Sequence, residues 1–577
     1  MDMLEKYKRR IDLAAGRDKV ELVLKNCKIV NVFSHRIIKG NIAIDSGKII
    51  GIGDYLGRNE IDMKGRYVAP GLIDSHQHME SSMVTPEQVA RILLPHGTTT
   101  IIADPHEIAN VCGLDGINFM INSTRNIPLN VFFMLPSCVP STSFESSGAS
   151  LKAEDLEELM EERIVLGLGE LMDYPNVIKG DDDVIKKALL ADRKIIDGHS
   201  PLVTGKDLNA YKINGVKTDH ECSNLKEMEE KLDLGMFIAI REGSAARDLE
   251  KLIQGVNCQN ERRITFCTDD KHPGDILREG HIDFNIRKAI SLGIDPIAAI
   301  KMATINTAEC YYLRDIGAIA PGYDADLIVL EDLNDFKVKE VYKKGVLVAK
   351  DGIPLFSVSK PDISMVDDTV DIADVKKEDL EIRLKSDIAK VIRVSPRSLL
   401  TELVTRKVSV DSENRFVSNK YIDIVKLAVI ERHGKSNSLG LALVENMKIR
   451  NGAIGTTIAH DSHNLIIIGD NDEDMLLVID EIKRLKGGIA VASRGKIGES
   501  LSLQVAGLMS PLPMEEVSEA LNRIDYFIKE NLGANDDIDT LMTLSFLALP
   551  VIPDVKLTDQ GLFNVNTMSF INMDVEE

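Results

Sequence analysis

The segment GLIDSHQHME, residues 71 to 80, contains two histidines separated by a single residue. Because side chains alternate between the two faces of a strand, His76 and His78 are predicted to point to the same side. Two neutral imidazoles that converge on one point are suitable ligands for a divalent transition-metal ion. An HxH pair alone is more often structural, so a metal site would need further ligands from elsewhere in the chain.

Four more residues of ligand type stand at the ends of short apolar runs, in GLGELM, KIIDGHS, VKTDHE and ITFCTDD. Six ligands exceed one tetrahedral shell with an open position. Two metal ions roughly 3.5–4 Å apart, bridged by a carboxylate and a hydroxide, would use all of them. We therefore predict a centre of two divalent transition-metal ions, with the ligands His76, His78, Glu170, His199, His220 and Asp269.

The elements that must position these residues follow from the rhythm of the chain. From Val68 onward, eight short apolar runs alternate with helix-like segments, and nearly every run ends in ionisable residues. Eight buried strands alternating with helices predict a (β/α)8 barrel, whose chemistry lies at the C-terminal ends of the strands. An open doubly wound sheet is the alternative, but it does not explain ligands at nearly all the strand ends.

The segments on both sides of the predicted barrel contain short strands and turns, so we expect one small β domain built from both flanks. After a linker rich in Ser, Pro and Asp, the chain continues as a separate α+β domain of ordinary size. The predicted fold class is thus α/β. Its boundaries are residues 1–67 and 316–355 for the small β domain, 68–315 for the barrel and 376–577 for the C-terminal domain.

The composition is that of a globular protein, with 44% hydrophobic and 28% charged residues. The net charge of −22 argues against nucleic acid or an anionic membrane as a general partner. No apolar stretch is long enough to span a bilayer. The seven cysteines form no CxxC pair, and reduced thiols in a cytoplasmic protein are the simplest interpretation.

Two motifs, GRYVAPGLIDSHQH and GAIAPGYDADLIVL, resemble the flanking signatures of the amidohydrolase superfamily. Several members of that superfamily carry a carboxylated lysine on the fourth strand, where this chain has Glu170. With ADPHEIANVCG, DGHSP, TDHE, CTDDKHP and AHDSHN, this residue makes the chain similar to bacterial and archaeal adenine deaminases over essentially its whole length. The resemblance implies hydrolysis of free adenine to hypoxanthine and ammonia in purine salvage.

The same resemblance implies Mn or Fe as the ions, with Zn as an alternative, and adenine and water as partners; we also expect a homo-oligomer. The predicted mechanism is attack of a metal-bound hydroxide on carbon 6 of the purine. Asp269 is expected to take the hydroxide proton and pass it to the leaving nitrogen. We expect Glu170 to bridge the two ions, one held by His76, His78 and Asp269 and the other by His199 and His220.

Other ionisable residues near the strand ends are candidates for substrate contacts. Glu221 and His272 are the further catalytic candidates, although strand alternation could turn Glu221 away and His272 could cap a loop. The segment AHDSHN contains two more histidines, and an ordinary strand-to-turn segment is a simpler interpretation than a further ion site or a pocket cover. The predicted substrate-binding residues are Glu80, Asp104, His106 and Glu107.

Two other classes of protein remain as alternatives. A cyclic-amide hydrolase of the same superfamily, similar to dihydroorotase or hydantoinase, would share the metals but usually has the fourth-strand lysine. A non-catalytic binding protein on the same barrel would have lost ligands, whereas all six are present here. Assays with adenine, adenosine, guanine and dihydroorotate discriminate among these functions.

Overall fold

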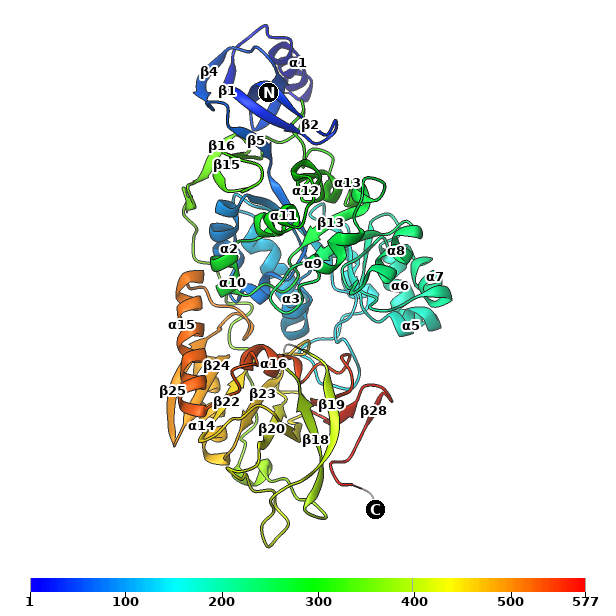
Figure 1. Ribbon diagram of the computed structural model, residues 1–577, viewed down its shortest axis with the longest axis vertical. Helices are drawn as coiled ribbons and strands as arrows, with labels where there is room; N and C mark the ends of the chain where they lie inside the picture. Colours follow the sequence, from blue (N-terminus) through cyan, green and yellow to red (C-terminus); the bar gives the residue numbers. More distant parts are fainter. Residues whose placement is uncertain (1, 397, 576–577) are drawn as a thin grey trace.

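The computed structural model describes residues 2–396 and 398–575, which form three parts arranged along the long axis of the molecule (Figure 1). Among these residues, a nine-stranded sheet lies at the N-terminal end, a part rich in parallel strands and helices lies in the middle, and an eight-stranded sheet lies at the C-terminal end. Within the described residues, no helix combines the length and the apolar character needed to cross a membrane.

In the described part of the chain, eight parallel strands form the central part in two sheets, with orders β10-β9-β8-β7-β6 and β11-β12-β13. Single bridges connect the two sheets at both seams, from Gln77 to Asp269 and from Ile196 to Val216. Each strand lies within one of the eight apolar runs. The strands are β6 (Leu72–Gln77), β7 (Thr98–Ala103), β8 (Asn130–Leu135), β9 (Val165–Leu171), β10 (Ile195–Gly198), β11 (Thr218–Asp219), β12 (Phe237–Arg241) and β13 (Ile264–Cys267).

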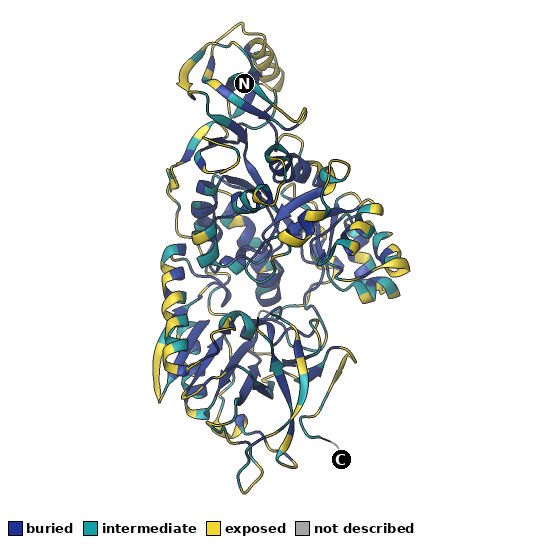
Figure 2. Ribbon diagram, in the orientation of Figure 1, coloured by how far each residue is buried: buried dark blue, intermediate teal, exposed yellow. Residues whose placement is uncertain are grey.

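Helices follow the central strands and cover them, and much of the middle of the molecule is buried (Figure 2). Strands β6 and β7 are buried along their whole length. In α2 (Pro86–Leu93), Pro86 occupies the first turn and the apolar residues Val89, Ala90, Ile92 and Leu93 are buried. The other helices include α3 (His106–Thr124), α4 (Ala153–Met160), α5 (Tyr174–Lys179), α6 (Asp182–Leu190), α7 (Gly205–Lys212), α8 (Leu225–Asp233), α9 (Leu249–Leu252), α10 (Pro273–Glu279), α11 (Ile282–Ser291), α12 (Pro296–Met302) and α13 (Ile305–Cys310).

Segments from both flanks of the central part share one sheet, with the order β17-β16-β15-β14-β5-β1-β2-β3 and β4 beside β1. Helix α1 (Met3–Ala14) precedes it, and its strands are β1 (Val20–Asn31), β2 (Arg36–Asp45), β3 (Lys48–Ile52), β4 (Gly57–Asp62), β5 (Tyr67–Pro70), β14 (Leu327–Leu330), β15 (Val338–Lys343), β16 (Val346–Lys350) and β17 (Ile353–Pro354). The apolar run that begins at Val68 therefore divides between two sheets. It divides at Gly71, where a Cβ atom would lie 2.2 Å from Thr99 Oγ1, so the close backbone approach requires glycine.

The C-terminal part is a sheet with the order β19-β18-β21-β20-β23-β22-β24-β25, beside a small sheet of β26, β27 and β28. Its strands are β18 (Ile388–Val394), β19 (Thr401–Lys407), β20 (Ile424–Ile430), β21 (Leu439–Glu445), β22 (Gly452–Thr456), β23 (Leu465–Gly469), β24 (Gly488–Ser493), β25 (Lys496–Ser502), β26 (Val555–Thr558), β27 (Gly561–Asn564) and β28 (Ser569–Phe570). Its helices are α14 (Asp472–Leu485), α15 (Met514–Phe527) and α16 (Thr540–Phe546). The amphipathic patterns in the sequence predict α14 and α15.

Backbone and side-chain hydrogen bonds join the C-terminal part to loops of the central part. The Ser510 N–H donates to Met83 O at 2.8 Å, and the Thr85 N–H donates to Ser510 O at 3.2 Å. The Ser462 hydroxyl donates to Glu145 Oε2 at 2.7 Å. Since Met83 and Thr85 belong to the loop after β6, the C-terminal part lies beside the strand ends where chemistry is expected.

Candidate active site

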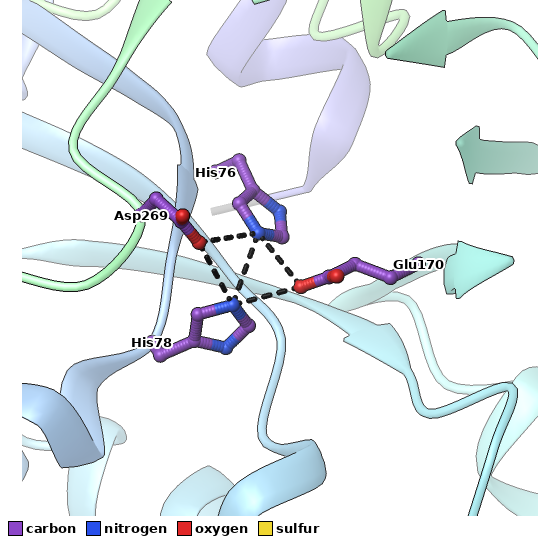
Figure 3. Close-up of side chains that lie close together, drawn as sticks. All are labelled: His76, His78, Glu170 and Asp269. Atoms are coloured by element: carbon purple, nitrogen blue, oxygen red, sulfur yellow. Dashed lines mark hydrogen bonds and ion pairs between the residues drawn. The ribbon is translucent and has the colours of Figure 1, made fainter. Parts of the chain in front are cut away.

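Four of the six predicted ligands lie together at the C-terminal ends of the central strands (Figure 3). The Nε2 atoms of His76 and His78 are 3.1 Å apart. Glu170 Oε1 lies 3.0 Å from the first and 2.8 Å from the second, and Asp269 Oδ1 lies 3.5 and 3.2 Å from them. All four side chains are buried. Two imidazole nitrogens and two carboxylate oxygens thus surround one point.

The other carboxylate oxygen of Glu170 faces a second pair of imidazoles. Glu170 Oε2 lies 2.7 Å from His199 Nδ1 and 3.5 Å from His220 Nε2. The rings of His76 and His220 stack with their centroids 4.1 Å apart, so the two groups are adjacent. Glu170 therefore presents one oxygen to each group, which is the arrangement of a bridging carboxylate.

A close contact between two strands holds Glu170 in this position. Asp104, at the end of β7, accepts a hydrogen bond from the Glu170 N–H at 3.0 Å through Oδ2. The preceding residue is Gly169, where a Cβ atom would lie 2.0 Å from the same oxygen. The GLGEL sequence thus allows the Asp104 carboxylate to reach the backbone of β9 because residue 169 has no side chain.

The Asp269 backbone connects the last central strand to the first. Its N–H donates to His76 O at 3.0 Å, and the His78 N–H donates to Asp269 O at 3.3 Å. Asp269 has a φ of +57°, in the left-handed region that few non-glycine residues adopt. The two backbone hydrogen bonds to His76 and His78 hold Asp269 in this conformation.

The chemistry of the cluster fits divalent transition-metal ions. Glu170 Oε1 and His220 Nε2 are buried, and neither atom forms a hydrogen bond with another residue in the described ranges 2–396 and 398–575. Burial lowers the pKa of His76, but the Glu170 and Asp269 carboxylates outweigh it and raise the pKa to about 10. A site that attracts a proton so strongly also attracts a metal cation, and imidazole with carboxylate is a donor set of Zn, Mn and Fe sites.

Three of the other predicted site residues line a cavity of about 440 Å³ between the central and C-terminal parts, namely Glu80, Glu107 and His272. Ser81 contributes to the same wall. Segments of β22, α15 and α16 form the opposite wall. Polar and ionisable side chains line this cavity together with apolar ones, and a concave space beside a ligand cluster is where a small-molecule site is expected.

His106 and Asp104 lie between this cavity and the ligand cluster. The His106 Nδ1 lies 3.9 Å from Glu170 Oε1, and its Nε2 lies 3.5 Å from Glu107 Oε1. Both carboxylate oxygens of Asp104 accept hydrogen bonds from the backbone, because Oδ1 also accepts one from the His106 N–H at 3.1 Å. Asp104 therefore positions Glu170 and His106 in this structure.

Arg241, at the end of β12, is a residue of the site that the motif analysis did not single out. Its Nη1 pairs with Asp269 Oδ2 at 2.9 Å and with the Glu221 carboxylate. Burial would raise the pKa of Asp269, but this guanidinium and the nearby imidazoles hold it well below its usual range. The sequence feature that points to Arg241 is its place in MFIAIREG, because it stands at the end of a strand, as the six predicted ligands do.

Glu221 directly follows His220 and nevertheless faces the site. Its Oε1 lies 3.7 Å from His220 Nε2 and 4.0 Å from His199 Nδ1. Strand alternation does not apply here, because β11 ends at Asp219 and the chain has left the strand. Burial raises the pKa of Glu221, but Arg241 and the two imidazoles lower it by more, so the net shift is downward.

Comparison with known proteins matches both large parts of the chain. The Amidohydrolase family model matches residues 67–348, and the model of the Adenine deaminase C-terminal domain matches residues 398–569. An adenine deaminase of Clostridium acetobutylicum is 55% identical over 97% of this chain and 99% of its own length. An adenine deaminase of Nitratidesulfovibrio vulgaris (strain DP4) is 48% identical, covering 98% of both chains. Adenine deaminase 2 of Desulfotalea psychrophila is 46% identical, covering 99% of both.

The chain belongs to the adenine deaminase family. This membership confirms the family predicted from the motifs and identifies the chain as an enzyme, a hydrolase. It disfavours the cyclic-amide hydrolase and the non-catalytic binding protein. As a member of the adenine deaminase family with an amidohydrolase part, the chain is a metallo-hydrolase with a C-terminal domain, and its histidine and carboxylate cluster is suited to divalent ions.

Proposed function

We propose that this chain hydrolyses free adenine to hypoxanthine and ammonia, a reaction of purine salvage. The observation that carries the proposal is the match to adenine deaminases along almost the whole chain, with 55% identity over 97% of it. The bridging orientation of Glu170 supports the same reaction class, since two-metal sites commonly serve hydrolysis. Adenine and water are the proposed reactants.

We further propose that the ligand cluster holds two ions, with Mn or Fe favoured over Zn. His76, His78 and Asp269 would hold one ion, His199 and His220 the other, and Glu170 would bridge them. When bound, such ions make water a nucleophile at neutral pH and stabilise the negative charge that develops on the purine.

Asp269 is the proposed proton carrier. Its Oδ1 faces the imidazoles, while Oδ2 is held by Arg241 at 2.9 Å, so the carboxylate has a fixed orientation. We propose that Asp269 takes a proton from the attacking water and delivers it to the leaving nitrogen. Glu221 and His272 are the further proposed acid–base residues, and Glu80, Asp104, His106 and Glu107 are proposed to shape the substrate side.

The finer architecture is also a proposal. Eight parallel strands with a bridge at each seam support a (β/α)8 barrel over residues 68–315. The sheet shared by both flanks supports a small β domain of residues 1–67 and 316–355, beside the C-terminal domain of residues 376–577. The homo-oligomer stays a prediction.

Metal content is expected to be about two transition-metal ions per chain, because six ligands fill two half-sites that share one carboxylate. Elemental analysis of the purified or reconstituted protein measures it directly. Titrating the ions into metal-free protein while adenine turnover is followed should give full activity only near the second equivalent. Full activity at one ion or fewer per chain would contradict the two-ion site.

Free adenine is expected to be deaminated far faster than adenosine, because the relatives that match almost the whole chain are named for the free base. The test compares initial rates on adenine, adenosine, guanine and dihydroorotate with metal-loaded protein. Ammonia release reports the first three, and ring opening reports dihydroorotate. Comparable rates on adenine and adenosine, or turnover of dihydroorotate alone, would overturn the proposed substrate.

A further inference from the structure

Glu107 from the central part meets two histidines from the C-terminal part at the cavity. Its Oε1 accepts a hydrogen bond from His460 Nδ1 at 2.8 Å, and its Oε2 is paired with His463 Nε2. All three side chains are buried. The contact joins residues more than 350 positions apart in the chain, and it uses both oxygens of the carboxylate.

Several contacts hold the segment that carries the two histidines, residues 459–464, in place. The His460 N–H donates to Ser545 O at 3.0 Å, and its ring stacks on Phe546 with centroids 4.4 Å apart. The buried Arg432 donates from Nε to His463 O. The segment is therefore a built wall of the cavity, anchored to the C-terminal sheet and to α16.

The hydrogen bonds of His463 argue against a third metal ion between these residues. The Ala459 N–H donates to His463 Nδ1 at 3.2 Å, so this nitrogen has no proton of its own. A neutral imidazole then carries its proton on Nε2, the atom that faces Glu107. A protonated nitrogen has no lone pair for a metal, so Glu107, His460 and His463 form a hydrogen-bonded triad.

The Nε2 atom of His460 is the one imidazole nitrogen of the triad that points away from Glu107 and into no other hydrogen bond of the triad. His460 lines the cavity, and its Nε2 makes no hydrogen bond with any residue in the described ranges. The walls of the same cavity contain the apolar side chains of Ile458, Leu541 and Met542. A flat heteroaromatic base has apolar faces and polar edges, so these walls suit its faces and His460 suits an edge.

His106 connects the ligand cluster to the Glu107 carboxylate that His460 contacts. The His106 ring spans the gap, with Nε2 3.5 Å from Glu107 Oε1 and Nδ1 3.9 Å from Glu170 Oε1. A base whose carbon 6 faces the cluster therefore turns its remote edge, which contains N3 and N9, toward the C-terminal wall. Residues 459–464 are the part of that wall that carries an imidazole.

We propose that His460 is a substrate-binding residue for the remote edge of the purine and that Glu107 is the residue that positions it. This inference rests on the proposed function. Burial lowers the pKa of His460, but the Glu107 carboxylate outweighs it and raises the pKa to about 9. Nε2 then carries a proton at neutral pH and donates it to a ring nitrogen. The C-terminal domain would thus supply part of the purine pocket.

The test uses the full-length, metal-loaded protein with His460→Asn and His460→Gln. The Asn amide reaches about as far as Nδ1 and can still donate to Glu107, but it presents nothing at the position of Nε2. The longer Gln side chain can present its amide nitrogen there. The matched control is His35→Asn, which removes a half-exposed imidazole in the turn between β1 and β2. Measurements are kcat and KM for adenine, the dissociation constant of hypoxanthine by calorimetry, metal content and thermal midpoint.

Loss of one hydrogen bond to the base is expected to raise KM and the hypoxanthine dissociation constant about tenfold in His460→Asn. Metal content should remain at the parental level, and His460→Gln should recover part of the affinity. The parent should bind either 3-deaza- or 9-deazahypoxanthine more weakly than hypoxanthine, and this difference should disappear in His460→Asn.

Parental KM and hypoxanthine affinity in a folded His460→Asn would overturn the proposal, as would a deaza penalty that persists in it. A fall in kcat alone would overturn it too, because it would point to a role in the chemical step. If His460→Asn does not fold, His460→Gln decides through the deaza comparison, which it should preserve. A parent protein that does not deaminate adenine at all would instead contradict the proposed function.

Discussion

Replacing Asp269 with asparagine is expected to lower adenine turnover about 10²- to 10⁴-fold, the usual contribution of general acid–base catalysis. The amide keeps the shape of the side chain and can still offer an oxygen to a metal ion, but it cannot hold the proton. It also removes the negative charge that faces Arg241, whose Nη1 lies 2.9 Å from Asp269 Oδ2. The measurement is kcat for adenine together with metal content.

The control for this variant is Asp207→Asn, which makes the same change on the exposed face of α7. It should retain parental turnover and metal content. Loss of metal together with activity in Asp269→Asn would mean that the ligand role dominates. Turnover within a few-fold of the parent, with the metals retained, would show that another residue carries the proton, with His272 and Glu221 the next candidates.

Replacing Glu170 with glutamine is expected to reduce metal content to about one ion per chain or fewer and to lower turnover by at least about 100-fold. The carboxylate presents Oε1 to His76 and His78 and Oε2 to His199 and His220. A neutral amide has one acceptor oxygen and an NH₂ group, so it can serve only one of the two groups. Substitution of residues that merely support metal ligands typically costs about 10–100-fold, and a shared ligand should cost more.

Glu158→Gln is the matched control, since Glu158 is exposed on α4. It should bind metal and turn over adenine as the parent does. The Glu170 variant is expected to keep its fold, because removal of one negative charge among several imidazoles leaves the strands in place. Circular dichroism and the thermal midpoint would test this. Unchanged metal content and turnover in Glu170→Gln would exclude it as the bridge.

Much of the site follows from local sequence patterns. The period of two in a strand places His76 and His78 on one side, and the position of Glu170, His199, His220 and Asp269 after short apolar runs places them at strand ends. Because the C-terminal ends of parallel strands lie at the same edge of a sheet, these residues must come together if the strands lie next to one another. The motifs also identify the family, which depends on residue types and spacing alone.

Packing between distant segments decided the rest. The division of the run at Gly71 between two sheets depends on the contact with Thr99, and the pairing of Arg241 with both Asp269 and Glu221 depends on how β12 and β13 lie side by side. The role of His460 and His463 depends on where the C-terminal sheet docks, because Glu107 lies more than 350 residues earlier in the chain. Period and composition describe one element at a time. A contact between elements depends on their relative placement, and this is set by the packing of all of them together.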